Sequence, residues 1–250
     1  MRIGTVTYNL AQRRPSETAL RALVQGAGAA DVFIVAVQEH SDFLEAMRFR
    51  RASQYSANFA HILRGLSAAL PSMHCIAAVE HGAQGLAVYQ RMPSAQQIAT
   101  IAINKASTGP WLTSSKGGIG VCLRVREGSA TMSLAVVAAH LAAGMAAGVR
   151  NTHFRDIVAR LALGGSLLHA DAAVFLGDLN YRAAHGELHK DQLRQEILAN
   201  RVLPAFAESA IAFAPTYRLV VGPQRLYDNL RAPAWCDRTL VYVRTIFRRR

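Results

Sequence analysis

The stretch Ala172-Ala-Val-Phe-Leu-Gly-Asp-Leu-Asn180 holds an apolar run that ends abruptly in a carboxylate and an amide. A short, unbroken run of Val, Phe and Leu bounded by glycine predicts a strand that is buried on both faces. A charge placed directly after such a strand lies at the rim of the sheet, where a partner has to offset its partial desolvation. Asp178 and Asn180 therefore mark a candidate site at one rim of the predicted sheet.

Four further apolar runs also end in a side chain that can bind a ligand. These side chains are Asn9 after residues 3–8, Glu39 after residues 32–38, His140 after residues 134–139, and Asp237 after residues 233–236. Taken singly, a carboxylate after a strand is most often a helix N-cap or turn residue, and a lone histidine is more often structural. Together, the five strand ends predict a common rim, which is where α/β sheets bind ligands.

Apolar runs and helical periodicity predict one α/β domain over residues 1–250, because no repeat, linker or low-complexity segment divides the chain. The expected strands cover residues 3–10, 32–38, 73–80, 85–90, 97–103, 118–126, 131–139, 172–177 and 239–246. The expected helices cover residues 16–29, 41–51, 55–70, 148–163 and 187–201, and Ser16 is a plausible N-cap of the first.

The 250 residues are 51% hydrophobic and 18% charged, which excludes a disordered chain, collagen and a coiled coil. The formal net charge is +12, and arginine supplies nearly all 28 basic residues, since only Lys105, Lys116 and Lys190 are lysines. Either this is a compositional bias, or the partner is anionic: a nucleic acid, an acidic membrane surface or a phosphorylated small molecule. Composition alone leaves both interpretations open.

Three cysteines without a paired spacing fit a reducing compartment, so we expect a cytoplasmic protein. No long apolar run occurs near the N-terminus, so no signal peptide is expected. Residues 131–149 contain no Asp, Glu, Lys or Arg and have about the length of a membrane span. They are rich in Ala and Gly and include His140, so we expect a buried strand that runs into a loop and no transmembrane helix.

The strand ends offer oxygen ligands and one histidine, a set that suits Mg²⁺ better than zinc. Proteins present Mg²⁺ to a substrate phosphate by holding the ion with one or two carboxylates. His140 would then contact a phosphate oxygen, Asp178 would orient a water, and Asn180 would donate to the charge of the transition state. The pattern predicts metal-assisted hydrolysis of a phosphate ester.

Two six-residue strings carry a resemblance to a known family. Gly177-Asp-Leu-Asn-Tyr-Arg182 and Pro233-Ala-Trp-Cys-Asp-Arg238 resemble the signature motifs of the inositol polyphosphate 5-phosphatases, a branch of the endonuclease/exonuclease/phosphatase superfamily. Shorter strings follow the order of that family: Thr7-Tyr8-Asn9, Gln38-Glu39, Lys116-Gly117-Gly118, His140-Leu-Ala-Ala143, Arg150-Asn151 with Arg155-Asp156, Asp191-Gln192-Leu193, and Phe213-Ala-Pro-Thr-Tyr-Arg218. The resemblance extends over about residues 3–243.

The resemblance implies a four-layer α-β-β-α sandwich that removes the 5-phosphate of phosphoinositides or soluble inositol phosphates, with Mg²⁺ as cofactor. Carried over by position, the metal site matches Glu39 with Asn9 beside it, and the catalytic residues match His140, Asp178, Asn180 and Asp237. The residues expected to bind substrate are Lys116, Arg182, Tyr217, Arg218 and Arg231. Peripheral contact with an anionic membrane is a further expectation.

Tyr217, Arg218 and Arg231 match the positions with which the family grips the neighbouring 4-phosphate. The family commonly has Lys where this chain has Arg218, and arginine also binds phosphate as a permanent cation. Asn229 stands where the family has a second basic contact, which weakens this grip. Lys116 has an alternative interpretation as part of a hairpin turn.

The C-terminal end departs from the family pattern. In the family a further strand ends in Ser-Asp-His, and its histidine forms a dyad with the aspartate that Asp237 matches. The sequence ends at Arg250 without a histidine after His189, so we expect a domain that is truncated relative to the family and lacks its last strand. Two alternatives to an active phosphatase stay open: an impaired protein that still binds phosphoinositides, and a Mg²⁺-dependent nuclease. An aromatic content of only 7% argues against nucleic acid as the partner.

Overall fold

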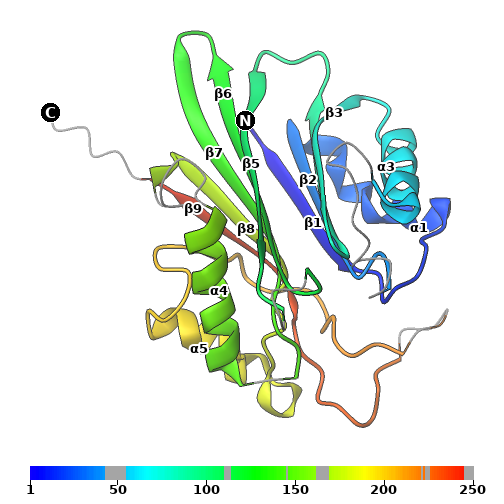
Figure 1. Ribbon diagram of the computed structural model, residues 1–250, viewed down its shortest axis with the longest axis vertical. Coiled ribbons are helices and arrows are strands. Elements are labelled where there is room, and N and C mark those ends of the chain that lie inside the picture. The colour runs from blue at the N-terminus through cyan, green and yellow to red at the C-terminus, as the bar shows by residue number, and fades with distance from the viewer. Residues whose placement is uncertain are drawn as a thin grey trace, which may run out of the picture.

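Two β-sheets lie face to face, and helices cover the outer face of each sheet (Figure 1). The computed structural model describes residues 1–42, 55–109, 114–144, 146–161, 169–220, 222 and 226–244. Within these residues the layers follow the order helices, sheet, sheet, helices. The expected four-layer α-β-β-α sandwich is therefore confirmed.

The first sheet has four strands in the order β1-β2-β4-β3. The strands are β1 (Ile3–Asn9), β2 (Val32–Gln38), β3 (Met73–His81) and β4 (Gln84–Arg91). β1 and β2 run parallel, and the other neighbours are antiparallel. The helices packed on this sheet are α1 (Glu17–Leu23), the short 3-10 helix η1 (Gln25–Ala29) and α3 (Ala57–Ala69).

The second sheet has five strands in the order β5-β6-β7-β8-β9. The strands are β5 (Gln97–Ser107), β6 (Gly117–Glu127), β7 (Ala130–His140), β8 (Ala172–Asp178) and β9 (Asp237–Val243). Only β7 and β8 are parallel neighbours. The helices on this side are α4 (Ala147–Leu161), α5 (Gln192–Leu198) and two 3-10 turns, η4 (Ala184–Gly186) and η5 (Leu188–Lys190).

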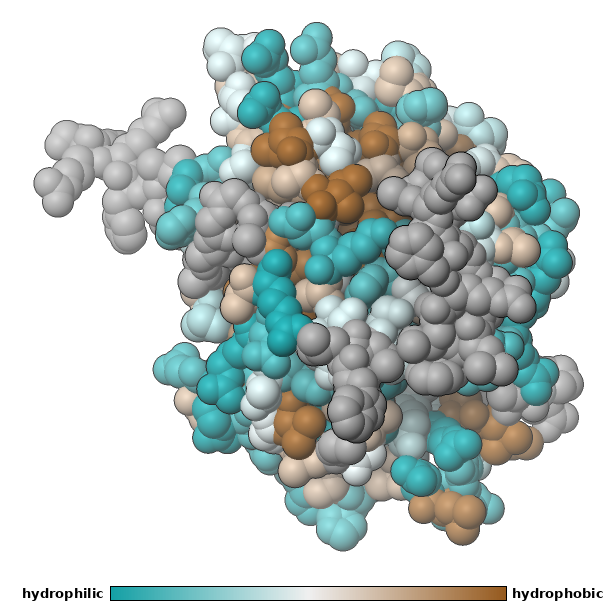
Figure 2. Space-filling view, viewed as in Figure 1, coloured by the Kyte–Doolittle hydropathy of each residue, from teal (hydrophilic) through white to brown (hydrophobic). Residues whose placement is uncertain are grey.

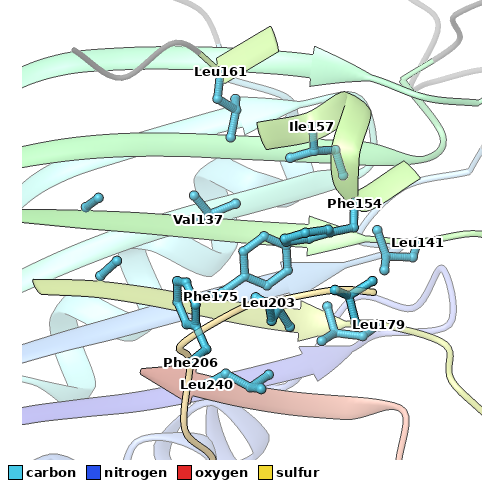
Figure 3. Close-up of a cluster of buried hydrophobic side chains, with 14 of the residues drawn as sticks. Val137, Leu141, Phe154, Ile157, Leu161, Phe175, Leu179, Leu203, Phe206 and Leu240 are labelled. Atoms are coloured by element: carbon cyan, nitrogen blue, oxygen red, sulfur yellow. The ribbon is translucent and has the colours of Figure 1, made fainter. Parts of the chain in front are cut away.

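Three apolar clusters fill the three spaces between the layers. Ile34 and Val136 belong to the cluster between the two sheets, and Ile62 of α3 belongs to the cluster under the first layer of helices. On the other side, Phe154 of α4 packs edge-on against Phe175 of β8, with 5.4 Å between ring centroids (Figure 3). Because β2 and β8 lie at the centre of this packing, both are almost completely buried, as their unbroken apolar sequences predict.

All nine expected strands are present, although residues 245 and 246 of the last one lie outside the described residues. The helices differ more from expectation. The predicted helix at 16–29 splits into α1 and η1 at Val24, while α3 lies inside the predicted 55–70. The predicted helix at 187–201 is wrong in its first part, because the Asp191 side chain accepts a hydrogen bond from Arg194 N and starts α5 there. Most of the predicted helix at 41–51 lies outside the described residues, as do residues 162 and 163.

Residues 131–149 form β7 and the start of α4, joined by a connection after His140. The expected strand followed by a loop is confirmed. None of the described helices is both long enough and apolar enough to cross a membrane.

β1 is an edge strand. Among the described residues it pairs with β2 only, and all of its residues are at least partly exposed, whereas β2 is buried throughout. The strand lies over β9 of the other sheet, where Thr5 Oγ1 and Thr239 Oγ1 are 3.3 Å apart. The C-terminal ends of β1 and β2 and the start of β9 thus lie at one end of the sandwich.

Candidate active site

Neighbouring strand ends bring three ionisable side chains into one row. In the register of the second sheet, His140 on β7 lies beside Asp178 on β8, and Asp178 lies beside Asp237 on β9. The first sheet faces this row, because Asn9 Nδ2 donates a 2.9 Å hydrogen bond to Asp178 Oδ2. Glu39 follows β2, and its Oε1 lies 3.7 Å from His140 Nε2. The five predicted residues therefore meet at one rim, although residues 233–236 form no strand and Asp237 lies at the start of β9.

Asp178 is held through both carboxylate oxygens. Oδ2 accepts the bond from Asn9, and Oδ1 accepts one from the backbone N–H of Asn180 at 3.1 Å. The strand requires glycine at Gly177, where φ is +140° and a Cβ would lie 1.9 Å from the carbonyl oxygen of Ala139 on β7. Since Asp178 is only 6% exposed, its orientation is set by the fold.

Asn180 presents its amide in one orientation. Its backbone lies in the left-handed region, with φ +56°. The side-chain Oδ1 accepts from Arg182 Nη2 at 3.0 Å, and Nδ2 donates to the carbonyl of Leu141 at 3.0 Å. An amide nitrogen has two hydrogens, so within the described residues one N–H of Asn180 is left for a ligand.

Glu39 is also held in the left-handed region, with φ +51°, a conformation that costs a non-glycine residue about 1–3 kcal/mol. Gln12 N donates to its carbonyl oxygen at 2.8 Å. The next residue, His40, is fully buried, lies 3.4 Å from the Glu80 carboxylate and stacks on the Phe59 ring. These contacts fix the backbone around a carboxylate whose side chain is still 34% exposed.

Lys116 lies against His140, with 2.5 Å between Nζ and Nε2. Burial, together with the charge of Lys116, lowers the pKa of His140 to about 3, against the opposing charge of Glu39. Burial also lowers the pKa of Lys116, against the opposing charges of Asp178 and Glu39. His140 is therefore neutral at pH 7, and its nitrogen accepts a hydrogen bond from the Lys116 amine.

Asp237 differs from Asp178 in its surroundings. Its Oδ1 is buried and has no hydrogen-bond partner within the described part of the chain. Burial raises the pKa of this carboxyl well above its ordinary range, and the neighbouring charge of Asp178 raises it further. A donor or a cation beside Oδ1 would offset the cost of this buried oxygen.

Three of the predicted substrate-binding residues form a connected group. The Arg182 guanidinium lies 3.7 Å from the centroid of the Tyr217 ring, and Arg231 Nη1 lies 3.4 Å from the Tyr217 hydroxyl. Arg182 also lies 2.7 Å from Cys236 Sγ and donates to Asn180. Arg182 therefore connects Asn180, a predicted catalytic residue, to Tyr217, which is predicted to bind a phosphate of the substrate.

The other two predicted substrate-binding residues lie apart from this group. The Arg218 side chain is 54% exposed, and its Nε lies 3.7 Å from Asp228 Oδ2. Lys116 contacts His140, within the row of strand ends. The alternative interpretation of Lys116 as a turn residue is partly right, because β6 starts directly after it at Gly117.

The sequence did not predict which residues of α4 and α5 hydrogen-bond to the site and support it. Gln192 Oε1 accepts from the backbone of Arg182 at 3.0 Å and from Arg150 Nη2 at 2.6 Å. Arg150 is fully buried, and Asn151 Oδ1 accepts from the Tyr181 hydroxyl at 2.7 Å. The short sequence matches at Arg150-Asn151 and Asp191-Gln192-Leu193 pointed to these residues. A short match does not show which atoms form hydrogen bonds.

The residues at the rim fit a hard divalent cation. The donors are oxygens, and no group of three or more His, Cys, Asp or Glu side chains that could enclose a metal is found among the described residues. Mg²⁺ typically binds through one or two carboxylates and keeps several waters. The partly exposed carboxylate of Glu39 and the Oδ1 of Asp237, unpartnered within the described residues, are oxygens that such an ion would bind.

Comparisons with known proteins agree with this geometry. The family model for Endonuclease/Exonuclease/phosphatase family 2 matches residues 6–246. Type IV inositol polyphosphate 5-phosphatase 9 of Arabidopsis thaliana is 32% identical over 51% of this chain and 38% of its own length. Type II inositol 1,4,5-trisphosphate 5-phosphatase of Mus musculus is 28% identical over 94% of this chain and 26% of its own length. The chain thus spans well under half of either relative.

A solved structure shares the fold. The inositol polyphosphate 5-phosphatase domain of SPsynaptojanin, in complex with inositol (1,4)-bisphosphate and a calcium ion, matches with a TM-score of 0.78 and 23% identity. The match covers 97% of this chain and 76% of that one. Together with the relatives, it confirms the resemblance carried by the two signature strings. The chain belongs to endonuclease/exonuclease/phosphatase family 2.

Proposed function

We propose that this chain is a Mg²⁺-dependent phosphomonoesterase that removes the 5-phosphate from phosphoinositides or soluble inositol phosphates. The observation that carries the proposal is the fixed carboxylate of Asp178, whose Oδ2 lies 3.5 Å from Nε2 of the neutral His140. The proposal also draws on the relatives, whose names describe inositol polyphosphate 5-phosphatases.

Asp178 is the residue that orients the attacking water. Because Asn9 and Asn180 each occupy one of its oxygens, the lone pairs left on the carboxylate define where a water can bind. The carboxylate takes the proton of that water as its oxygen attacks phosphorus. The free N–H of Asn180 and the Lys116–His140 pair donate to the phosphoryl oxygens, where negative charge develops.

Glu39 is the carboxylate that would hold the cation, with Asn9 beside it and Asp237 across the rim. When bound, Mg²⁺ supplies a Lewis acid that neutralises phosphoryl charge and stabilises the leaving oxygen. The chain's own contribution is the fixed backbone of Glu39, which keeps that carboxylate at the rim. We propose Mg²⁺ because hard oxygen donors in small number suit this ion.

Tyr217, Arg231 and Arg218 would bind a second phosphate of the substrate. The first two are already in contact with each other, and Arg182 joins them to Asn180. Guanidinium groups bind phosphate through two parallel hydrogen bonds. A head group with adjacent phosphates therefore fits better than an isolated phosphate ester. All three cysteines are free, which supports a cytoplasmic site of action.

Phosphate release from soluble inositol 1,4,5-trisphosphate, measured with and without Mg²⁺, tests the proposal. We expect Mg²⁺-dependent release that falls by at least about 10³-fold in Asp178→Asn, because that amide cannot accept the proton. Asp31→Asn is the matched control, since Asp31 precedes β2 at the opposite end of the first sheet and should leave turnover unchanged. Cleavage of DNA at a higher rate than the inositol phosphate would contradict the proposal in favour of a nuclease.

The unpartnered Oδ1 of Asp237 favours a second candidate function. A protein that binds phosphoinositides without turnover would keep the Tyr217–Arg231 group and lack a proton-transfer partner for Asp237. This candidate predicts binding that Arg231→Ala weakens, with no phosphate release at any Mg²⁺ concentration. Measurable turnover by the wild-type chain would exclude it.

A further inference from the structure

Cys236 stands directly before Asp237 in the second signature string, and the proposed function gives it no role. The residue is 2% exposed. Its carbonyl oxygen accepts a hydrogen bond from the backbone N–H of Leu179 at 2.8 Å, and its own N–H donates to Thr216 Oγ1 at 3.2 Å. The backbone of Cys236 is thus tied to the segment that follows β8, and the fold fixes the position of Sγ.

The Cys236 thiol makes two contacts of opposite kind. Its S–H donates to the carbonyl oxygen of Tyr181 at 3.5 Å, and its sulfur accepts from Arg182 Nη1 at 2.7 Å. Burial and the charge of Asp178 raise the pKa of this thiol well above its ordinary value, against the opposing charge of Arg182. A thiol that stays protonated is a poor nucleophile, but it can donate and accept at once. The chemistry of the side chain therefore fits a hydrogen-bonding role.

The contact with sulfur helps to set the direction of the Arg182 guanidinium. Arg182 Nη2 donates to Asn180 Oδ1 at 3.0 Å, and the group lies over the Tyr217 ring, 3.7 Å from the ring centroid. A guanidinium carries its N–H groups in a rigid, planar fork. Bonds from both Nη1 and Nη2 therefore fix where the fork points, which stacking on a ring does not. With the fork fixed, the Asn180 amide keeps its donor and its orientation.

Packing alone is the competing explanation for a buried cysteine. Cys236 belongs to a small apolar cluster with Ala183, Ala234 and Trp235, whereas the surface near the centre of Figure 2 is mainly teal and pale. If the cysteine only fills space, alanine in its place should lower stability without a specific loss of activity. Serine should then be no better than alanine, because a hydroxyl group is costly to bury. A hydrogen-bonding role predicts that serine restores activity.

We propose that Cys236 is a positioning residue whose thiol holds the Arg182 guanidinium, and through it the Asn180 amide, in the orientation that the reaction requires. The inference rests on the proposed function, because Asn180 acts there on the phosphoryl group. It gives the cysteine a role that involves no covalent bond to the substrate.

Steady-state kinetics on inositol 1,4,5-trisphosphate with Mg²⁺ test this role. In Cys236→Ala we expect kcat to fall about tenfold while KM changes by less than about twofold, and in Cys236→Ser we expect most of the lost kcat to return. Cys122→Ala is the matched control, since Cys122 is also buried but lies within β6, and its loss should leave kcat unchanged. A kcat in Cys236→Ser no higher than in Cys236→Ala would overturn the proposal.

A double variant shows whether the thiol acts through the arginine. Methionine at position 182 donates no hydrogen bond, so Cys236→Ala should lower kcat no further when it is combined with Arg182→Met. If Cys236→Ala lowers kcat by the same factor with and without Arg182→Met, the thiol does not act through Arg182 and the proposal fails.

Nuclear magnetic resonance of the arginine side chains separates this inference from the proposed function. The guanidinium signal of Arg182, assigned by its absence in Arg182→Met, should shift in Cys236→Ala and return toward its wild-type position in Cys236→Ser. If it does so in a chain that never releases phosphate, Cys236 still positions Arg182 and the proposed function fails. If phosphate is released while this signal and kcat are unchanged in Cys236→Ala, the positioning role fails and the proposed function stands.

Discussion

The strand-end centre and the neighbouring residues 217–220 and 226–231, here called the arm, lie side by side but are built in opposite ways. His140, Asp178 and Asn180 are 1%, 6% and 3% exposed, and they are placed by the continuous ladder of β7, β8 and β9. Leu230 is 90% exposed, and the described part of the arm is joined by isolated bridges. The difference indicates that the sheet register positions the predicted catalytic residues, while the proposed substrate-binding residues Tyr217, Arg218 and Arg231 lie on an element with little support.

Substitutions should therefore divide into two groups. Changes in the centre should alter stability or the chemical rate, because each side chain there is packed and hydrogen-bonded. Changes on the arm should alter binding alone, because its side chains make few contacts within the fold.

The largest effect is expected at Gly177. In Gly177→Ala the new Cβ would meet the Ala139 carbonyl at 1.9 Å, at a φ of +140°. Such a clash in a central strand should lower the free energy of unfolding by about 3 kcal/mol or more. Gly26→Ala is the matched control, since no atom lies within 4 Å of the Cβ position there. Denaturant unfolding measures both, and equal stability of the two variants would show that the centre is not rigidly packed.

A fall in pH should lower the free energy of unfolding through His81, at the end of β3. Burial and the charge of Lys105 lower the pKa of His81 to about 4. Below the ordinary value of 6.5 the unfolded chain takes up a proton that the folded chain refuses, so stability should fall as the pH drops from about 6.5 to 4, by about 2 kcal/mol.

His81→Gln should remove this part of the pH dependence. His189→Gln is the matched control, because the His189 side chain is 74% exposed and should leave the profile unchanged. Denaturant unfolding at several pH values gives the slope of the free energy of unfolding against pH for each variant. An unchanged slope in His81→Gln would contradict the role given to this histidine.

Arg182→Lys should reduce kcat by about tenfold with a smaller change in KM. A lysine keeps the charge, but it cannot donate to Asn180 and Cys236 together while lying over the Tyr217 ring. The exposed Arg155→Lys on α4 is the matched control. If only KM rises in Arg182→Lys, the arginine binds substrate and does not position Asn180.

Arg218→Gln should have the smallest effect, a KM for inositol 1,4,5-trisphosphate that rises about threefold with kcat unchanged. The side chain is more than half exposed and its ion pair with Asp228 is long, so its loss should leave the fold intact. Steady-state kinetics separate the two constants. A fall in kcat would mean that the arm takes part in the chemical step, which would remove the distinction between the two regions.

The layers and the rim could be predicted from the sequence because burial leaves a clear pattern. The runs that form β2 and β8 are apolar since both faces are covered, and the first charged residues at their ends, Glu39 and Asp178, have to lie at the rim. Parallel pairing then brings the strand ends together. The pairing of Asn9 with Gln38, next to Glu39, and of His140 with Asp178 follows from these two rules, whereas Asp237 joins them as the first residue of the antiparallel strand β9.

The remaining features depend on contacts between distant residues. Arg182 was expected to bind substrate, but its position depends on Tyr217 and Cys236, which lie far along the chain. The left-handed backbone of Glu39 depends on Gln12 and on the burial of His40. No local pattern carries such information, so the supporting residues of the site could not be predicted.

The central claim is that the rim removes one particular phosphate. The most direct test is to identify the product that the wild-type chain forms from inositol 1,4,5-trisphosphate and Mg²⁺ by phosphorus NMR. We expect inorganic phosphate and inositol 1,4-bisphosphate in equal amounts, with neither formed by Asp178→Asn. Release of the phosphate from the 1- or 4-position, or the same product from Asp178→Asn, would contradict it.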